Sequence, residues 1–269
     1  MDFVNNATRK TLYKVIDYLI EDPETHFEKA MNTINKITPK SVFYSQRSVF
    51  SESIADKNNW YQLLVKMTKL NPEVMPDLIK TVGVDANILA WPVQEKMRDK
   101  YHCNIPWAIL LDPTSACNLH CKGCWAAEYG HNLNLSYNDI DSIITQGKEL
   151  GIHVYIYTGG EPLVRKKDLI KLCEKHSDCA FLCFTNATLI DEEFCQDMIR
   201  VKNFIPAISA EGFEEATDAR RGEGVYKRIE EAMDLLNSHK LPFGISACYT
   251  SENASSIATE EYWDWMIEK

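Results

Sequence analysis

Two adjacent stretches decide how this chain folds, IPWAILLD at residues 105–112 and CNLHCKGC at residues 117–124. The first is a compact apolar run of the kind that forms a buried strand. The second places Cys117, Cys121 and Cys124 in a C-x3-C-x2-C pattern just after that strand. Three thiolates so close together can hold one inorganic group, and soft sulfur ligands suit an iron–sulfur cluster or zinc. We therefore expect the chemistry to lie at the carboxyl end of this strand.

Strands and helices alternate from this point to the end of the chain. Strands are predicted at 105–112, 154–157, 180–184, 204–209 and 243–249, and helices at 136–150, 167–175, 191–200, 225–238 and 260–268. Five strand–helix units in a row are typical of a parallel sheet or a barrel. We therefore expect an α/β fold that contains a partial (β/α) barrel. The array ends on a helix without a closing strand, so the last strand or strands are expected to be missing.

The first hundred residues read as helices only. Apolar stripes at helical spacing begin at Leu12, Phe27 and Trp60, and Asp22-Pro23 supplies a helix cap followed by proline at the first helical position. We interpret the stripes as packed core. The chain is therefore predicted to contain an all-helical region at 1–102 and an α/β core at 103–269, the core being incomplete at its carboxyl end.

Composition limits the classes of protein that fit. The 269 residues are 45% hydrophobic and 25% charged, which argues against wholesale disorder. A net charge of −10 without a basic stripe disfavours a nucleic-acid-binding protein. The chain starts without the blocks of a secretory signal, and no apolar run is long enough to cross a bilayer. We therefore expect a cytoplasmic protein without a transmembrane segment, whose nine cysteines are thiols or metal ligands.

Polar clusters follow the later predicted strands. They are Thr158-Gly159-Gly160-Glu161-Pro162, Thr185-Asn186-Ala187-Thr188-Leu189, and Ser209-Ala210-Glu211-Gly212 with the later Arg220-Arg221-Gly222. Each cluster alone could be an ordinary turn. The carboxyl ends of parallel strands meet at one rim, however, and barrel enzymes build their active sites there. Clusters after successive strands therefore predict one site shared with the cysteines.

The cysteine motif alone is compatible with two kinds of metal site, a zinc site and an iron–sulfur cluster. A structural zinc site normally needs four ligands, and the fourth here would be His120, His131 or a distant cysteine. A cubane iron–sulfur cluster held by three cysteines instead leaves one iron free to bind another molecule. A non-catalytic iron–sulfur or zinc-binding protein is therefore the alternative to an enzyme.

In combination, the motifs resemble those of the radical S-adenosylmethionine (SAM) superfamily. The matching features are C-x3-C-x2-C after the first strand, Gly-Gly-Glu-Pro after the second and Ser-x-Glu after the fourth. The resemblance covers roughly residues 105–269. Within it, the segment 208–224 is similar to the SPASM-like branch that includes peptide-modifying and sulfatase-maturing enzymes.

The resemblance implies a particular cofactor site. Cys117, Cys121 and Cys124 would bind three irons of a 4Fe–4S cluster, and the amino and carboxylate groups of SAM would bind the fourth iron. The segment 159–162 would meet the methionine ammonium, and Ser209 and Glu211 would bind the ribose hydroxyls. Arg220 or Arg221 would pair with the methionine carboxylate, or else lie in a solvated loop. The residues expected to bind SAM are thus Gly159, Gly160, Glu161, Pro162, Asn186, Ser209, Glu211 and Arg220.

The implied reaction is radical chemistry. An electron from a flavodoxin- or ferredoxin-type reductant would reach SAM through the cluster, and the resulting 5′-deoxyadenosyl radical would abstract a hydrogen atom. The substrate would be a peptide, a small molecule or a lipid. Two features depart from the family pattern, since Gly123 stands where an aromatic residue is usual, with Trp125 just beyond, and five strands are counted instead of six. A truncated radical SAM protein without turnover is therefore a further alternative.

Overall fold

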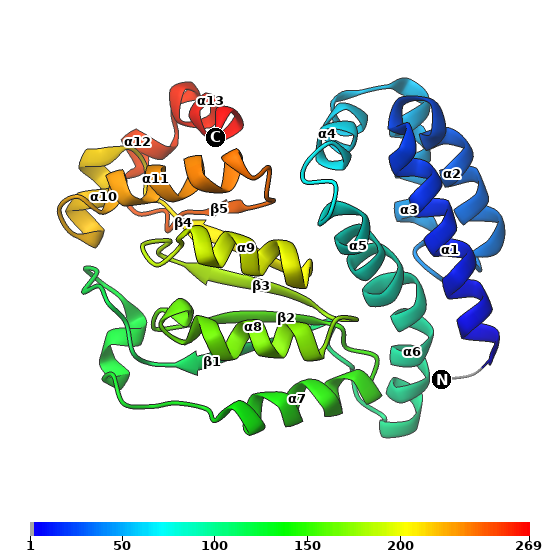
Figure 1. Cartoon of the computed structure of the whole chain (residues 1–269), viewed down its shortest axis with the longest axis horizontal. Coiled ribbons are helices and arrows are strands. Elements are labelled where there is room, and N and C mark those ends of the chain that lie inside the picture. The colour runs from blue at the N-terminus through cyan, green and yellow to red at the C-terminus, as the bar shows by residue number, and fades with distance from the viewer. Residues whose placement is uncertain (1–2) are drawn as a thin grey trace.

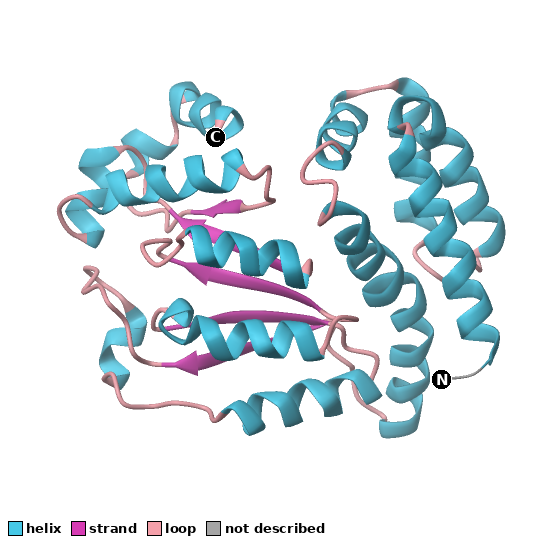
Figure 2. Ribbon diagram, viewed as in Figure 1, coloured by secondary structure: helices cyan, strands magenta, loops and turns pink. Residues whose placement is uncertain are grey.

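The computed structural model describes residues 3–269, and a parallel five-stranded sheet forms its centre (Figures 1 and 2). The strands follow one another in space in the order β1-β2-β3-β4-β5, each parallel to the next. Their bounds are β1 Ala108–Thr114, β2 Val154–Gly159, β3 Ala180–Thr185, β4 Phe204–Ser209 and β5 Gly244–Ser246. The predicted α/β fold with a partial barrel is therefore confirmed.

A helical crossover joins each strand to the next, as parallel pairing requires. The helices of the α/β part are α7 Tyr137–Glu149, α8 Lys166–Lys175, α9 Glu192–Val201, α10 Glu214–Arg221, α11 Val225–Ser238, α12 Ala254–Ile257 and α13 Glu260–Glu268. Short 3-10 turns, η2 Trp125–Tyr129 and η3 Pro162–Arg165, follow β1 and β2. Helices α10 and α12 were not predicted. The first segment is polar and carries two adjacent glutamates and two adjacent arginines, so it reads as a loop.

The two faces of the sheet differ in burial. Tyr155, Tyr157 and Phe181 are fully buried on the face that packs against the helices. The strand register aligns Leu110, Ile156, Leu182 and Ile205 in a row on the other face. Leu110 is 58% exposed, so this second face is apolar and open at β1.

From residue 3 onward, the described part of the amino-terminal region consists of six α-helices and a π-helical stretch. They are α1 Phe3–Glu21, α2 Pro23–Ile37, α3 Tyr44–Asp56, α4 Asn59–Thr68, α5 Met75–Ile79, the π-helical η1 Lys80–Leu89 and α6 Ala90–Tyr101. Figure 1 shows this region beside the amino ends of the strands, whose arrows point away from it. In the contact, the Gln94 Nε2 atom donates a hydrogen bond to the Gly151 carbonyl at 2.7 Å. The helical region therefore lies at the end of the sheet opposite the cysteine motif.

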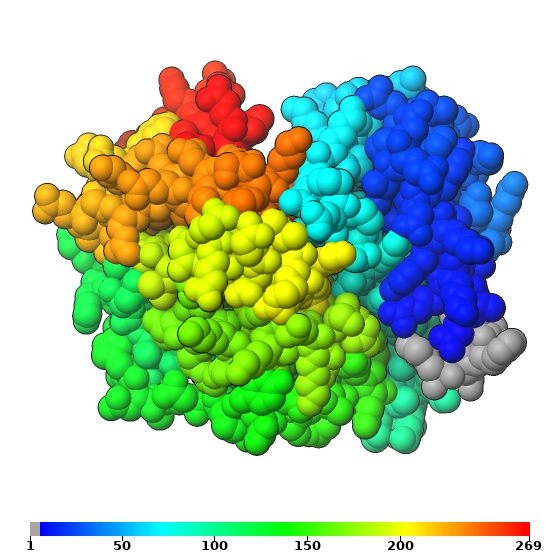
Figure 3. Space-filling model, in the orientation of Figure 1, coloured from blue at the N-terminus to red at the C-terminus, as the bar shows by residue number. Residues whose placement is uncertain are grey.

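The periodicity predicts that the stripe beginning at Trp60 is packed core, and the structure corrects this prediction. Trp60 is 67% exposed and Met67 is 41% exposed, while Tyr61 and Val65 of the same helix are buried. Part of the stripe, with Leu63 and Met67, lines a hollow of about 470 Å³ against α13 and β5. Figure 3 shows this hollow between the cyan surface of α4 and the red surface of the carboxyl end. Periodicity placed these side chains on one face but could not say which face is covered.

The helices described in residues 3–269 differ in length and in apolar character. None of them combines the length and the apolar character that a bilayer crossing needs.

Candidate functional site

The cysteine loop starts directly after β1 and is tied back to it. The Ser115 amide donates to the Leu133 carbonyl at 2.8 Å, and Thr114 forms an antiparallel bridge with Asn134. Between these anchors, Cys117, Cys121 and Cys124 are half-buried and line a cavity of about 130 Å³ that Gly160 also lines. The structure thus brings the cysteines beside the Gly-Gly-Glu-Pro segment, as the sequence predicts.

The spread of the three sulfur atoms bears on the kind of centre. In the described part of the chain, one set of three ligand-type atoms lies mutually within 4.8 Å, and it belongs to His153, Asp178 and Cys179. The three sulfurs of the cysteine loop are therefore spread more widely. Tetrahedral zinc, with Zn–S bonds of about 2.3 Å, would hold sulfurs about 3.8 Å apart. At least one pair of these sulfurs is therefore farther apart than the sulfurs of a tetrahedral zinc site.

Gly160 allows two backbone segments to meet. Its amide donates to the Thr114 carbonyl at 2.9 Å, and the next amide, that of Glu161, donates to the Ala116 carbonyl at 2.8 Å. A Cβ atom at position 160 would lie 2.6 Å from the Ser115 carbonyl oxygen and closer still to that of Ala116. The missing side chain is therefore what lets the end of β2 form hydrogen bonds with the cysteine loop.

Glu161 is buried, with 1% exposure, and its carboxylate joins the ends of two strands. One oxygen accepts hydrogen bonds from the Leu163 amide at 3.0 Å and the Thr185 hydroxyl at 2.7 Å, and the other accepts from the Asn186 amide at 2.7 Å. Burial raises the pKa of Glu161, while these hydrogen bonds act in the opposite direction. The carboxylate therefore holds the ends of β2 and β3 together.

We expect Glu161→Gln to lower the free energy of unfolding by about 1–3 kcal/mol. Both carboxylate oxygens accept hydrogen bonds, so the NH2 group of a glutamine would replace one acceptor and face a buried donor. Urea denaturation followed by circular dichroism measures the loss. Glu223→Gln is the control, since Glu223 is exposed between α10 and α11. Equal stability of the two variants would contradict the prediction.

Asn186 connects the end of β3 to the cysteine loop. Its Nδ2 atom donates to the Asn118 Oδ1 atom at 2.9 Å, and its own Oδ1 accepts from the Thr188 hydroxyl at 2.7 Å. Asn118 in turn donates to the Thr188 hydroxyl at 2.8 Å. The side chain is buried and lies in this network at the rim.

Glu211 has both carboxylate oxygens engaged within the chain. One oxygen forms ion pairs with Arg220 and Arg221, and the other accepts the Cys248 amide at 2.7 Å. The side chain is fully buried. Ser209, by contrast, is half-buried, and its hydroxyl forms no hydrogen bond with another described residue. Sequence reasoning placed Glu211 and Arg220 at different groups of one cofactor, whereas the structure pairs them with each other.

Arg221 is the site residue that sequence reasoning left least defined. It lies in the last turn of α10, and its Nη1 atom is 4.0 Å from the Cys121 sulfur. Burial raises the pKa of Cys121, and the charge of Arg221 lowers it. The sequence shows two adjacent arginines, Arg220 and Arg221. Which way their side chains point depends on α10, a helix that the sequence analysis does not predict.

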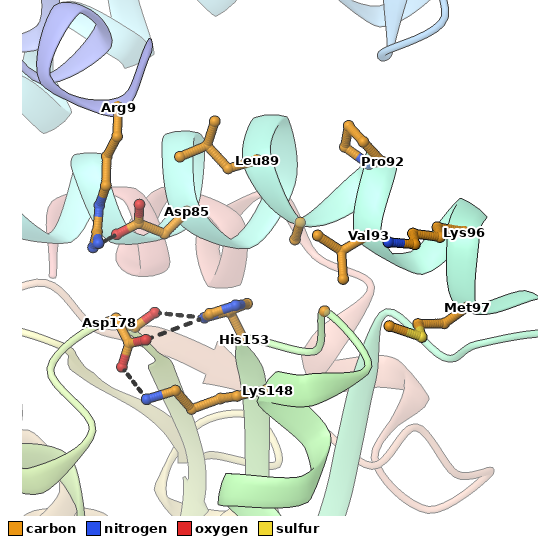
Figure 4. A pocket seen from close by; sticks show the side chains of 12 residues that line it. Arg9, Asp85, Leu89, Pro92, Val93, Lys96, Met97, Lys148, His153 and Asp178 are labelled. Carbon is orange, nitrogen blue, oxygen red and sulfur yellow. Dashed lines mark hydrogen bonds and ion pairs between the residues drawn. The ribbon is translucent and has the colours of Figure 1, made fainter. Parts of the chain in front are cut away.

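A second cluster of ligand-type side chains lies at the opposite end of the sheet, in a cavity of about 480 Å³ (Figure 4). His153 makes a 2.9 Å hydrogen bond between its Nδ1 atom and the Asp178 carbonyl, and the Asp178 carboxylate pairs with Lys148 at 2.7 Å. Across the cavity, Arg9 pairs with Asp85 at 2.8 Å. Arg9 and Asp85 pair within the helical region, and Lys148, His153 and Asp178 interact within the α/β part, so each set is satisfied on its own side of the cavity.

Comparison with known proteins shows the family. Residues 111–259, more than half of the chain, match the family model described as the Radical SAM superfamily. The chain belongs to the radical SAM superfamily. Membership implies a 4Fe–4S cluster and SAM as cofactors, and the matched range includes every residue that the sequence assigned to them.

Two relatives show how far the similarity extends. An uncharacterized protein of Archaeoglobus fulgidus is 28% identical over 151 residues, which cover 55% of this chain and 36% of that protein. A cysteine-type anaerobic sulfatase-maturating enzyme of Clostridium perfringens is 27% identical over 173 residues, which cover 56% of this chain and 46% of that enzyme. The chain thus spans less than half the length of either relative.

A solved structure supports the fold of this radical SAM chain. SuiB of Streptococcus suis, solved with its precursor peptide SuiA, matches with a TM-score of 0.55 at 23% identity, over 65% of this chain and 40% of that one. SuiB bound to S-adenosylmethionine matches with a TM-score of 0.54 over the same shares.

Proposed function

We propose that this radical SAM protein is an enzyme that binds a 4Fe–4S cluster through Cys117, Cys121 and Cys124 and binds SAM beside it. When bound, the cluster would supply the one electron needed to cleave SAM to methionine and a 5′-deoxyadenosyl radical, which would take a hydrogen atom from the substrate. The observation that carries the proposal is the pairing of the cysteine loop with the backbone of Gly160 and Glu161 at one rim of the sheet.

The donor set fits the cluster. Three half-buried thiols face one small cavity, and soft sulfur is the ligand type that iron–sulfur clusters take. At least one pair of the three sulfurs lies farther apart than the sulfurs of a tetrahedral zinc site. Because Gly160 has no side chain, its backbone can lie close to the carbonyl groups of the cysteine loop.

The other residues of the rim would bind and orient SAM. Backbone carbonyls of the segment 159–162 are suited to the methionine ammonium, since a cationic group needs acceptors. The Ser209 hydroxyl has capacity for a ribose hydroxyl. Glu211 would support this binding through the arginines it holds, and Arg220 remains our proposal for the methionine carboxylate. Asn186 would act from the same rim through its network with Asn118.

The substrate class is a finer question, and we propose a peptide or a small organic molecule. The open apolar face of the sheet beside the rim offers a surface for it, and SuiB is a structural neighbour solved with a precursor peptide. A one-electron reductant of flavodoxin or ferredoxin type would reduce the cluster. We place the protein in the cytoplasm as part of the same proposal. We further propose that the chain divides into a helical region at 1–102 and a core at 103–269.

The proposal is tested by reconstituting the full chain anaerobically with iron and sulfide and reducing it. Electron paramagnetic resonance (EPR) spectra are then recorded with and without SAM. We expect a reduced 4Fe–4S signal that changes when SAM is added. A signal unchanged by SAM would contradict SAM binding and favour an electron-transfer protein or a truncated enzyme without turnover. Stoichiometric zinc without iron would overturn the proposal and favour a structural metal site.

A further inference from the structure

Two arginines and one glutamate form a buried charge cluster against the cysteine loop. The Glu211 carboxylate is fully buried and pairs with Arg220 and Arg221, whose side chains are 22% and 12% exposed. Two positive groups on one negative group leave an excess of one positive charge. Because the cluster is largely shielded from water, its field reaches neighbouring groups with little screening.

The cluster of charges is fixed in position from several sides. The Lys122 amide, within the cysteine loop, donates to the Arg220 carbonyl at 2.8 Å. The Thr217 hydroxyl accepts the Glu211 amide at 3.1 Å, and the Cys248 amide beyond β5 donates to the Glu211 carboxylate at 2.7 Å. The last turn of α10 therefore cannot shift without moving the loop that carries the cysteines.

The two arginines differ in what they reach. Arg221 extends Nη1 to 4.0 Å from the Cys121 sulfur, and its Nε donates to Glu211 at 3.1 Å. The Arg220 side chain also pairs with Glu211, and its Nη1 atom donates a hydrogen bond to that carboxylate. One guanidinium thus contacts both the carboxylate and a thiol of the motif, while the other contacts the same carboxylate oxygen and has no hydrogen bond to a cysteine sulfur of the described residues.

We propose that Arg221 is a positioning residue that donates a hydrogen bond to the Cys121 sulfur and raises the reduction potential of the group bound there. This inference rests on the proposed function. One-electron reduction adds a negative charge to a cluster held by three thiolates, so a nearby fixed cation stabilises the reduced form more than the oxidised form. Hydrogen bonds to cluster sulfurs and local charge are known means of setting such potentials. Glu211 moderates the effect because it cancels one of the two positive charges.

The test is a potentiometric titration of the reconstituted full chain, followed by EPR in the absence of SAM. At the wild-type midpoint, Arg221→Gln should lower the ratio of reduced to oxidised cluster about tenfold, which equals a shift of about 59 mV for one electron. Arg221→Lys keeps the charge and should restore most of the ratio. Arg220→Gln is the matched control, and we expect it to change the ratio less than threefold.

Glu211→Gln supplies a change of opposite sign. This variant removes the negative charge beside the two arginines, so the ratio of reduced to oxidised cluster should rise. If Arg221→Gln does not bind iron, the result for Glu211→Gln still tests the inference. An unchanged midpoint in Arg221→Gln, an equal shift in Arg220→Gln, or a fall in Glu211→Gln would overturn the inference. Wild-type protein that binds no iron would overturn this inference and the proposed function together. Iron-loaded protein that shows the shifts but does not respond to SAM would overturn the proposed function alone.

Discussion

Replacing Cys124 by serine should reduce the iron bound after anaerobic reconstitution to less than a tenth of the wild-type amount. Cys124 is one of three half-buried thiols that line the same cavity, and each must hold a separate iron in the proposed site. A serine hydroxyl is a hard ligand that stays protonated, so it does not replace a thiolate. Iron and sulfide per chain measure the loss, and the SAM-dependent EPR change should disappear with it.

Cys103→Ser is the control for this experiment. Cys103 is exposed and lies before β1, outside the cysteine loop. It should bind as much iron as the wild-type chain. If Cys124→Ser kept full iron while Cys103→Ser lost it, the assignment of the three ligands would be wrong. Circular dichroism of both variants shows whether the fold is retained.

Gly160→Ala should weaken both stability and cofactor binding. The added methyl group would collide with the Ala116 and Ser115 carbonyls, which are backbone atoms of the cysteine loop and cannot turn aside as a side chain can. The loop would have to move away from the end of β2, with loss of the hydrogen bonds from the amides of Gly160 and Glu161. We expect unfolding to become easier by about 1–3 kcal/mol, together with at least a tenfold fall in SAM affinity.

Gly244→Ala is the matched control, because a Cβ atom there would meet nothing within 4 Å. Its free energy of unfolding should stay within about 0.5 kcal/mol of the wild-type value. Urea denaturation gives the stabilities, and equilibrium dialysis of the reconstituted protein gives the SAM affinity. Wild-type affinity in Gly160→Ala would show that the close approach of the two segments is not needed for binding.

Local sequence patterns predicted much of the fold. Ser136 and Asp139 form the capping box that their spacing predicts, with the Asp139 amide donating to the Ser136 hydroxyl at 3.1 Å. The predicted range 204–209 is the observed β4, and the ranges 225–238 and 260–268 are α11 and α13. These elements were predictable because their signals, caps and apolar runs, lie within the elements themselves.

Elements whose stability comes from distant contacts were predicted less well. The strand expected at 243–249 shortens to Gly244–Ser246, because β5 pairs with β4 over three positions only. The strand expected at 105–112 instead covers Ala108–Thr114, where pairing with β2 begins and ends. Strand bounds depend on the partner strand, and local composition does not contain that information.

The sequence by itself determined the family, the position of the three-cysteine motif after the first strand, and the edge of the sheet at which each polar cluster lies. The order of strands and the spacing of motifs are enough for that, since the carboxyl ends of parallel strands must share one edge. Only the tertiary structure decided that Glu211 faces two arginines, that Arg221 reaches Cys121 and that the α4 stripe lines an open hollow. Charge pairing and burial depend on which side chains the fold brings within a few ångströms, and residues far apart in the chain do not reveal this before it folds.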